Sequence, residues 1–354
     1  MSLKSLLDSS PSQANTDGEL QPDENSCGRI SELASEKWLR WLSRILPPVI
    51  LLFFVYVLYG LLGSYRYDDI VRELKNSESQ RITLAIILCV INYFVLTFYD
   101  SISFKLLDKK VDSTKIGLTA FLSYAFSNSL GFSVLSGGAV RYRLYSTLGI
   151  SAAEVAQILA FNAIHFWMGL FLLAGIVCLV NPQAVAVALS LSHFHSYVIG
   201  VSFLLPIIAY FIATALRREP IMLWRWEIPV PSPGLTLTGL LIASVDWLLA
   251  GSILFCLLPP VSIAQFDTVF MEVLSAFLIA MAGGVLTHVP GGIGVFEAVI
   301  LISLEHVFSG PSIIGALILY RCIYYLLPLF AAIFLFVLYE MRRKKSLFRN
   351  LFAR

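Results

Sequence analysis

Charged side chains are scarce in this sequence of 354 residues. Asp, Glu, Lys and Arg together make up 14% of it, whereas hydrophobic residues make up 58%. A water-soluble domain carries about 25% charged residues, because its surface has to be hydrated. The shortage of charge excludes a soluble globule of this size and predicts that much of the protein surface lies in lipid.

Sequence motifs for metal, disulfide and nucleotide chemistry are also missing. The chain has no C-x-x-C pair and no G-x-x-x-x-G-K-[ST] run, which would hold nucleotide phosphates. Four of the five cysteines lie inside apolar stretches: Cys89, Cys178, Cys256 and Cys322, but not Cys27. We therefore expect packing cysteines, no metal, no cofactor, no catalytic residues and no ATP hydrolysis by this chain.

The polar segments are concentrated at the two ends of the chain. Residues 1–28 are rich in Ser, Asp, Glu, Gln and Pro, and residues 30–45 read as an amphipathic interfacial helix. Residues 342–354 contain six basic groups and no acid. No folded basic domain accompanies them, so we expect anionic lipid headgroups as their partner, not nucleic acid. The predicted domains are a cytoplasmic tail with the interfacial helix (1–45), a membrane domain (46–340) and a basic cytoplasmic tail (341–354).

Apolar segments long enough to cross a bilayer fill the middle of the chain. A spanning helix needs about 20 mostly apolar residues to cross ~30 Å of hydrocarbon. Six segments qualify: 46–63, 82–104, 151–180, 196–216, 235–258 and 311–340. Two further apolar regions, 116–147 and 269–304, are interrupted by glycine, and each is either a re-entrant hairpin or two full passes. The predicted fold is an all-α polytopic membrane protein with about six full spans and two broken units.

Basic residues alternate between the connecting loops. The loops 105–115 and 217–234 carry several Lys or Arg residues, whereas 181–195, 259–268 and 305–311 carry none. Basic loops stay on the cytoplasmic side of a membrane. The pattern predicts a multi-pass membrane protein with both termini in the cytoplasm.

The two interrupted regions contain a short internal repeat. Residues 131–143 (GFSVLSGGAVRYR) align with 285–297 (VLTHVPGGIGVFE) at an offset of 154. The alignment pairs Gly137 and Gly138 with Gly291 and Gly292, and it pairs Arg143 with Glu297. The chain crosses the membrane three or five times between the starts of the two units. Because both counts are odd, the units form an inverted repeat, an arrangement that places transporter sites at its interruptions.

The glycine pairs predict breaks in the helices. A glycine costs a helix ~1 kcal/mol, and Pro290 can begin a helix but not continue one. We therefore expect new helices to begin at about Gly138 and Pro290. Helix N-termini attract anions, so two such ends near the middle of the membrane would bind a phosphate. The alternative is that the glycines only allow close helix packing.

Ionisable residues lie in or beside the apolar segments, where each Asp or Arg costs ~2.5–3.5 kcal/mol to insert. They are Asp100, Arg141, Arg143, His165, Asp246, Glu272, His288, Glu297 and Arg321. At this cost they are expected to face one another or a water-filled cavity.

Both signs of charge are present among these residues, which predicts a headgroup site. We expect Arg141 and Arg143 to contact a phosphate, and Asp246 and Glu297 to take an ammonium group or a coupling proton. Arg321 and His165 are further candidate contacts. Purely structural alternatives stay open. Arg141 and Arg143 could extend to the membrane interface, Asp246 could form a structural ion pair with an arginine, and His165 could form a hydrogen bond within the core.

Several of these motifs resemble the N-terminal membrane domain of the MprF (multiple peptide resistance factor) family. The resemblance extends over about residues 50–340 and is carried by six segments: 67–74, 99–107, 124–151, 246–260, 287–301 and 320–329. It implies a flippase of the bacterial cytoplasmic (inner) membrane that moves aminoacylated phosphatidylglycerol, such as the lysyl or alanyl lipid, and so protects against cationic antimicrobial peptides. The family's C-terminal synthase domain has no room in this chain, so synthase activity is expected to be absent.

Other classes of function fit the sequence less well. An intramembrane rhomboid-type protease would need G-x-S-G, and the run Val134-Leu135-Ser136-Gly137 lacks the first glycine. A small-solute or ion secondary transporter, and a non-transporting scaffold partner of a lipid synthase, both stay possible. The expected partners are phospholipid (phosphatidylglycerol or its aminoacylated form) and the membrane, and a homo-oligomer is left open.

Overall fold

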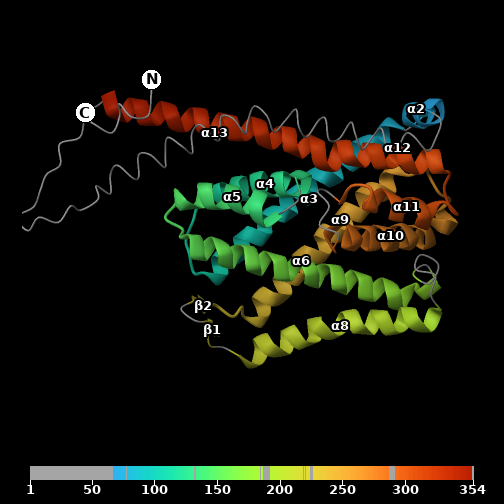
Figure 1. Ribbon diagram of the computed structural model, residues 1–354, viewed down its shortest axis with the longest axis horizontal. Coiled ribbons are helices and arrows are strands. Elements are labelled where there is room, and N and C mark those ends of the chain that lie inside the picture. The colour runs from blue at the N-terminus through green and yellow to red at the C-terminus, as the bar shows by residue number, and fades with distance from the viewer. Residues whose placement is uncertain are drawn as a thin grey trace, which may run out of the picture. The chain divides into compact units, whose positions relative to one another are not determined.

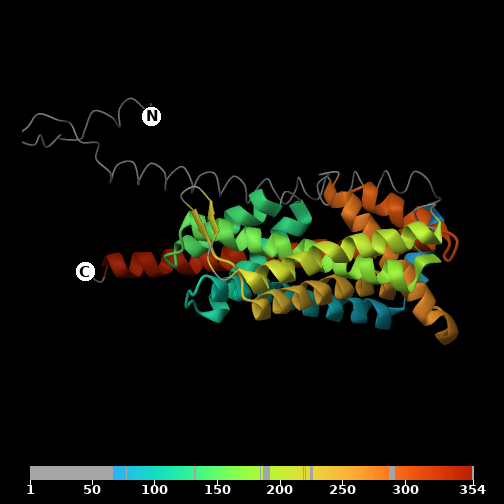
Figure 2. The ribbon, with the colours of Figure 1, turned by 90° about the horizontal axis from the view of Figure 1, so that it is seen from below.

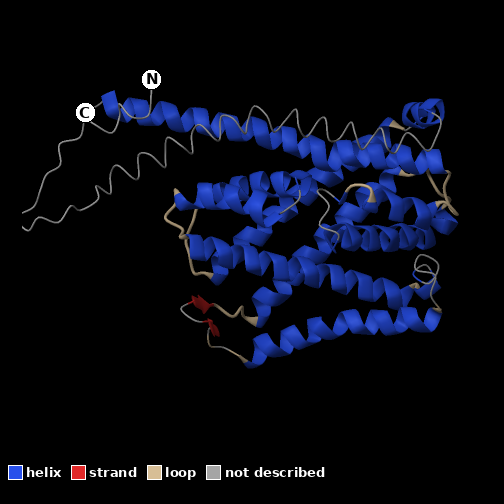
Figure 3. Ribbon diagram, viewed as in Figure 1, coloured by secondary structure: helices blue, strands red, loops and turns tan. Residues whose placement is uncertain are grey.

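The computed structural model describes residues 67–352, except for 77, 131–132, 184, 186–191, 218, 220, 224–225 and 287–291. The predicted polar tail, the interfacial helix and the first span at 46–63 lie outside the described residues. All the described elements belong to one compact unit, Phe54–Arg354. Almost all of them are helices (Figure 3), as the composition predicted.

Six helical segments of the described chain are long and apolar enough to cross a membrane. They are α3 (Ser79–Leu106), α6 (Ala152–Val180), α8 (His193–Leu216), α9 (Pro233–Leu257), η2 (Ile263–Gln265) with α10 (Phe266–Leu286), and α12 (Gly310–Tyr320) continued by η4 (Arg321–Leu326) and α13 (Leu327–Phe352). Five coincide with predicted spans, and α10 is the first half of the interrupted region 269–304. The predicted class, an all-α polytopic membrane protein, is confirmed.

Serine residues define where three of the long helices begin. Ser151 and Glu154 form a capping box at α6, with Glu154 N–H donating to Ser151 Oγ and Ser151 N–H donating to Glu154 Oε2. Ser232 and Ser309 cap α9 and α12, each followed by proline in the first helical turn. The serine oxygens satisfy N–H groups that have no partner in the helix, and proline has no N–H to satisfy.

Two smaller features lie in the connecting segments. The short helix α2 (Tyr67–Asn76) packs against α12. Strands β1 (Ile221–Leu223) and β2 (Trp226–Ile228) pair antiparallel and form a ribbon in the loop between α8 and α9. This ribbon is a local addition to the predicted helical fold.

Both interrupted regions fold as helical hairpins. Helix α4 (Ser113–Leu130) packs against α5 (Ser133–Ser146), and α10 packs against α11 (Val295–Leu304), as Figure 1 shows. At 1.5 Å per residue, α5 and α11 are about 21 Å and about 15 Å long. Neither can cross ~30 Å of hydrocarbon alone, so the lengths favour the re-entrant alternative for these two arms.

The position predicted for the first helix break is wrong. Gly137 and Gly138 lie inside α5, which begins at Ser133. A Cβ atom on Gly137 would collide with Ser127 Oγ and would lie 3.0 Å from the carbonyl oxygen of Ser123, both on α4. Gly137 therefore allows the two arms of this hairpin to approach closely, which is the packing alternative.

The second glycine segment does interrupt its helix. Gly292 and Gly294 lie between α10 and α11 with φ angles of +64° and +82°, a region that favours glycine. Gly292 also lies against Gly284 of α10, where a new Cβ would be 3.3 Å from the Gly284 Cα. Helix α11 begins at Val295, later than the start predicted at about Pro290, because Gly292 and Gly294 have left-handed conformations that a helix excludes. Pro290 and Gly291 themselves lie outside the described residues. The two copies of the motif therefore use their glycines differently.

The internal repeat extends well beyond the glycine motif. Helix α9 begins 154 residues after α3 (233 against 79), α10 begins 153 residues after α4 (266 against 113), and α12 begins 158 residues after α6 (310 against 152). Each copy is thus a long helix, a hairpin and a second long helix. Of the described elements, α3 and α9 make the most extensive helix–helix contact. The axes of the long helices are roughly aligned with one another in the turned view (Figure 2).

Candidate functional site

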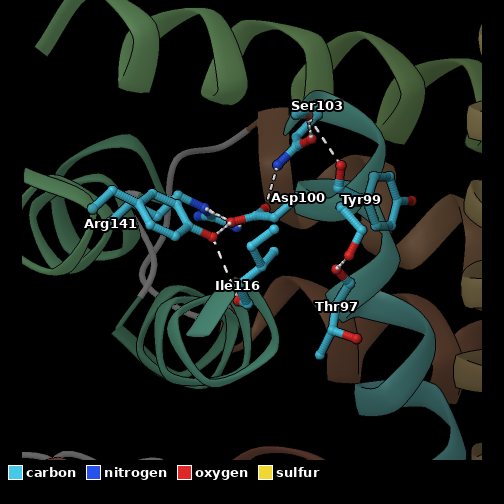
Figure 4. A network of polar contacts seen from close by, with 9 residues as sticks. Thr97, Tyr99, Asp100, Ser103, Ile116 and Arg141 are labelled. Carbon is cyan, nitrogen blue, oxygen red and sulfur yellow. Dashed lines mark hydrogen bonds and ion pairs between the residues drawn. The ribbon is translucent and has the colours of Figure 1, made fainter. Parts of the chain in front are cut away.

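The first buried charge cluster joins α3 to α5 through an ion pair. Arg141 Nε and Nη2 each donate to one carboxylate oxygen of Asp100 at 2.9 Å, and the exposed fractions are 2% and 0%. Tyr145 Oη and Asn162 Nδ2 donate to the same carboxylate, both at 2.7 Å. Figure 4 shows Asp100 at the centre of this network, with Arg141 directed toward it. Arg141 is buried and paired, so the alternative that its side chain snorkels to the interface is wrong.

Neighbouring helices complete this first cluster. Ser103 Oγ donates to Asn162 Oδ1 at 2.8 Å, which orients the asparagine toward Asp100. The Arg141 guanidinium lies 4.5 Å from the ring centroid of Tyr124 on α4, a cation–π contact. Four helices, α3 to α6, therefore converge on one bidentate ion pair.

The second buried charge cluster joins α11 to η4. Arg321 Nη2 and Nε donate to Glu297 Oε1 at 2.6 Å and 2.8 Å, and Gly294 N–H donates to Glu297 Oε2 at 2.7 Å. Glu297 thereby also stabilises the N-terminus of α11, where negative charge is favourable. The Arg321 guanidinium lies 4.7 Å from the ring centroid of Tyr325 and 5.4 Å from that of Phe296.

The segment η4 is a π-helical turn, and side chains of other helices bind its carbonyl groups. The pairs are Cys89 Sγ to Ile323 O (3.3 Å), Tyr93 Oη to Tyr324 O (3.1 Å) and Ser129 Oγ to Tyr325 O (3.2 Å). π-helical turns occur mostly as single turns within α-helices and frequently at functional sites. This one holds Arg321 at its first position and ties the last span to α3 and α4.

The third buried charge cluster contains Asp246, at the contact of α3 with α9. Asn92 Nδ2 donates to Asp246 Oδ1 at 2.8 Å, and Tyr99 Oη donates to Oδ2 at 3.3 Å. Asp246 is 5% exposed, and the described part of the chain offers it no arginine or lysine partner. The structural ion pair considered for Asp246 is therefore wrong, and its carboxyl group has neutral hydrogen-bond partners instead.

Asn92 is the residue that occupies the position of Asp246 in the first copy of the repeat. The two are 154 residues apart, the offset that separates the starts of α3 and α9. Equivalent positions of an inverted repeat touch only where the pseudo-two-fold axis passes between them. The third cluster therefore lies on the symmetry axis of the membrane domain.

Aromatic rings connect the three clusters. Tyr99 and Tyr124 have ring centroids 6.0 Å apart, which links Asp246 to the Arg141 cluster. On the other side, Tyr93 Oη donates a hydrogen bond to the carbonyl oxygen of Tyr324. The Tyr324 ring lies 5.3 Å from the ring of Tyr325, which contacts Arg321. The structure therefore brings together four predicted site residues in one polar and aromatic core: Arg141, Asp246, Glu297 and Arg321.

The other predicted site residues lie outside this core. Arg143 pairs with Glu340 of α13 at 2.9 Å and is partly exposed. His165 is buried against Gly239, and its Nδ1 contacts the carbonyl oxygen of Phe161 at 2.9 Å. A Cβ atom on Gly138 would lie 3.1 Å from a methyl carbon of Leu159, so this glycine also serves packing. Glu272 pairs with His306, and His288 lies outside the described residues.

Sequence reasoning missed several residues that complete the clusters. They are Asn92, Tyr99, Tyr124, Tyr145, Asn162 and Tyr325. The repeat offset of 154, applied to Asp246, would have indicated Asn92. The remaining contacts depend on helix packing, which no motif encodes.

Known proteins are similar to this chain in sequence. No family model matches the chain. The protein slr0712 of Synechocystis sp. is 35% identical over 80% of this chain and 89% of its own length. The inner membrane protein YbhN of Escherichia coli is 30% identical over 89% of this chain and 96% of its own length.

A more distant relative is the phosphatidylglycerol lysyltransferase of Staphylococcus aureus. It is 25% identical over 80% of this chain, which spans only 32% of that enzyme's length. This distant similarity agrees with the resemblance to the MprF family seen in the motifs. The near-complete match to YbhN, together with six apolar helices, makes the chain a multi-pass inner-membrane protein. It belongs to the YbhN family.

Proposed function

We propose that this chain moves a phospholipid from one leaflet of the inner membrane to the other. The observation that carries the proposal is the buried core of two ion pairs and one unpaired carboxyl group inside an inverted repeat. Charged groups in a membrane are costly, so those retained in the interior mark a path for ions or polar substrates. Inverted repeats place such sites near the middle of the bilayer.

The proposed cargo is aminoacylated phosphatidylglycerol, such as the lysyl or alanyl lipid. Its phosphate would bind Arg141 and Arg321, and its ammonium group would bind Asp246 or Glu297. An arginine binds carboxylate and phosphate with the same bidentate geometry. Each arginine can therefore exchange its carboxylate partner, Asp100 or Glu297, for the lipid phosphate. Arg143 and His165, with the glycine segment 291–292, are proposed as further contacts along the path.

The distant relative supports this choice of cargo. That protein is a phosphatidylglycerol lysyltransferase, and the part of this chain that aligns with it consists mainly of membrane helices, for which we propose no catalytic residue. We therefore propose that this chain acts on the lipid as a transporter and not as a transferase. The expected consequence is a less negative outer surface and resistance to cationic antimicrobial peptides. In this proposal both termini, residues 1–45 and 341–354, face the cytoplasm.

Reconstitution into liposomes tests the proposal. Vesicles would contain labelled phosphatidylglycerol or its lysyl derivative, and exposure of the label on each leaflet would be followed with and without the protein. We expect faster exchange of the lysyl lipid with protein and its loss in the double variant Asp100→Asn/Arg141→Gln, which removes both charges together. Lys109→Gln is the matched control, because it removes a partly exposed ion pair with Glu154. Exchange no faster than in empty vesicles would overturn the proposal, and solute flux without lipid exchange would identify a solute transporter.

A further inference from the structure

The pair formed by Asn92 and Asp246 differs from the other buried acids. Asp100 and Glu297 each bind an arginine, whereas Asp246 has only the amide of Asn92 and the hydroxyl group of Tyr99 as side-chain partners in the described structure. A carboxylate buried without a cation is costly. Asp246 is therefore able to bind a positive charge that the protein itself does not supply.

Asn92 supplies a second indication that something is missing. Its Nδ2 atom donates to Asp246, but its Oδ1 atom has no hydrogen-bond partner among the described residues, and the side chain is 0% exposed. Buried polar atoms are almost always satisfied, so an orphaned acceptor needs an explanation. An acceptor oxygen beside a carboxylate lacks a donor, and a proton on or near the carboxylate would provide one.

The groups around Asp246 contain no fixed positive charge. Those that interact with it electrostatically are four phenols: Tyr93 and Tyr99 of α3, Tyr124 of α4 and Tyr324 of η4. None of the titratable groups described on the other helices packed against α9 is among the side chains that act on Asp246; they include His165 of α6, which lies against Gly239, Tyr210 of α8 beside it, Asp267 and Glu272 of α10, and Tyr320 of α12. Within the described chain, no arginine or lysine forms an ion pair with Asp246, because the two buried arginines bind Asp100 and Glu297.

The position on the repeat axis gives this pair a role that the other clusters cannot have. When the halves of an inverted repeat rock about their axis, a group on that axis stays at the centre of the site and is approached from each side in turn. Asp100 lies in the first half of the repeat and Glu297 in the second, whereas Asp246 lies where the two halves meet.

We propose that the Asn92–Asp246 pair is a proton-binding site that couples lipid movement to the proton gradient. This inference rests on the proposed function and adds its energy source. A proton binds the Asp246 carboxylate from one side of the membrane and leaves to the other side, with the Asn92 amide as its hydrogen-bond partner. No covalent bond to the lipid forms or breaks.

Lipid exchange in proteoliposomes under an imposed pH gradient tests the coupling. We expect wild-type exchange to rise with the gradient and to lose this rise when an ionophore dissipates it. Asp246→Asn should lose the gradient-dependent part, whereas Glu272→Gln, which removes a partly buried acid near the start of α10, should keep it. The swap Asn92→Asp/Asp246→Asn should recover part of the gradient dependence, because the repeat axis places the new carboxyl group opposite the old one.

Infrared spectroscopy of the purified protein tests the same site without transport. A carboxylic acid band that titrates in the wild type, disappears in Asp246→Asn and shifts in Asp246→Glu would support proton binding at Asp246. A band unaffected by both variants would overturn the inference. Lipid exchange that ignores the pH gradient, or follows a sodium gradient instead, would overturn it and leave the proposed function standing. If the wild type exchanges no lipid, the proposed function fails and the infrared result decides the site.

Discussion

The two halves of the repeat share their helices but not their chemistry. In the first half, Asp100 on α3 binds Arg141 on the hairpin arm α5, and in the second half Glu297 on the arm α11 binds Arg321 on the last span. At the offset of 154, the positions equivalent to these four residues hold Leu254, Val295, Arg143 and Trp167. Neither ion pair has a counterpart in the other half, so the repeat specifies the architecture while each half acquired its own charges.

The hairpin tips differ in the same way. Gly137 lies within a helix and allows α5 to pack closely on α4, whereas Gly292 and Gly294 have left-handed backbone conformations that interrupt the chain before α11. The first half is thus held by close packing and the second by a cap, with Glu297 bonding the N–H of Gly294. The comparison predicts that equivalent substitutions in the two halves have different effects.

The largest expected loss of stability follows from the removal of one member of a buried ion pair. Arg141→Gln leaves Asp100 buried without its cation, and such a loss costs ~3–5 kcal/mol. We expect a much lower midpoint of thermal unfolding in detergent. The double variant Asp100→Asn/Arg141→Gln should recover most of the loss, because no uncompensated charge remains. Equal stability of the single variant and the wild type would show that the pair is not buried as described.

The corresponding change in the second half, Glu297→Gln, should sharpen the comparison. It removes the partner of Arg321 and weakens the cap of α11 at once, since Glu297 serves both. We expect a loss in the same range of ~3–5 kcal/mol. However, Glu297→Gln/Arg321→Gln should recover less than the pair in the first half, because the glutamine caps α11 less well. Unfolding midpoints of the four variants measure the difference, and equal recovery in both halves would contradict it.

A smaller effect is expected for alanine at the glycines of the first hairpin. A methyl group on Gly137 meets Ser127 Oγ and the backbone of Ser123, and overpacking of this kind costs ~1–3 kcal/mol. Gly138→Ala is the matched control, because its new methyl group meets only the flexible end of Leu159. Thermal unfolding should rank Gly137→Ala below Gly138→Ala. The reverse order would mean that α4 and α5 are not packed through Gly137.

The smallest expected effect concerns the serine caps of α6 and α12, which occupy equivalent places in the two halves. Replacement of an N-cap serine by alanine costs ~0.5–2 kcal/mol. Ser151→Ala should cost more than Ser309→Ala, because Ser151 forms a reciprocal capping box with Glu154, whereas Ser309 contacts another serine, Ser312. Unfolding midpoints in detergent measure both. A larger loss at Ser309 would show that the box adds nothing.

Sequence predicted the architecture well because the membrane imposes it. Long apolar stretches gave five of the described spans within a few residues, and glycine-interrupted stretches gave both hairpins. The break at Gly138 was misplaced because a glycine pair weakens a helix only slightly, and the fit against Ser123 and Ser127 outweighs that cost. Pattern alone cannot distinguish a glycine that breaks a helix from one that packs it.

The site was predicted only in part, for a related reason. The cost of charge in hydrocarbon singled out Arg141, Asp246, Glu297 and Arg321, and the structure gathers these four. It did not determine their pairing, since Asp100 and Arg141 are 41 residues apart and meet only through packing of α3 against its neighbours. Arg141 and Arg143 were both expected to contact a phosphate, yet Arg141 lies in the core, whereas Arg143 pairs with Glu340. Facing directions along a short, glycine-rich helix depend on its partner helices.

The most direct test of the account is the rate at which labelled lysyl-phosphatidylglycerol changes leaflet in vesicles that contain either the wild type or Asp100→Asn/Arg141→Gln. We expect the wild type to accelerate the exchange and the double variant to lose at least about tenfold in rate, equivalent to about 1.4 kcal/mol in the barrier. Unfolding midpoints of both proteins would establish that each is folded. A folded double variant that exchanges lipid as fast as the wild type would contradict a role for the buried ion pairs in lipid movement.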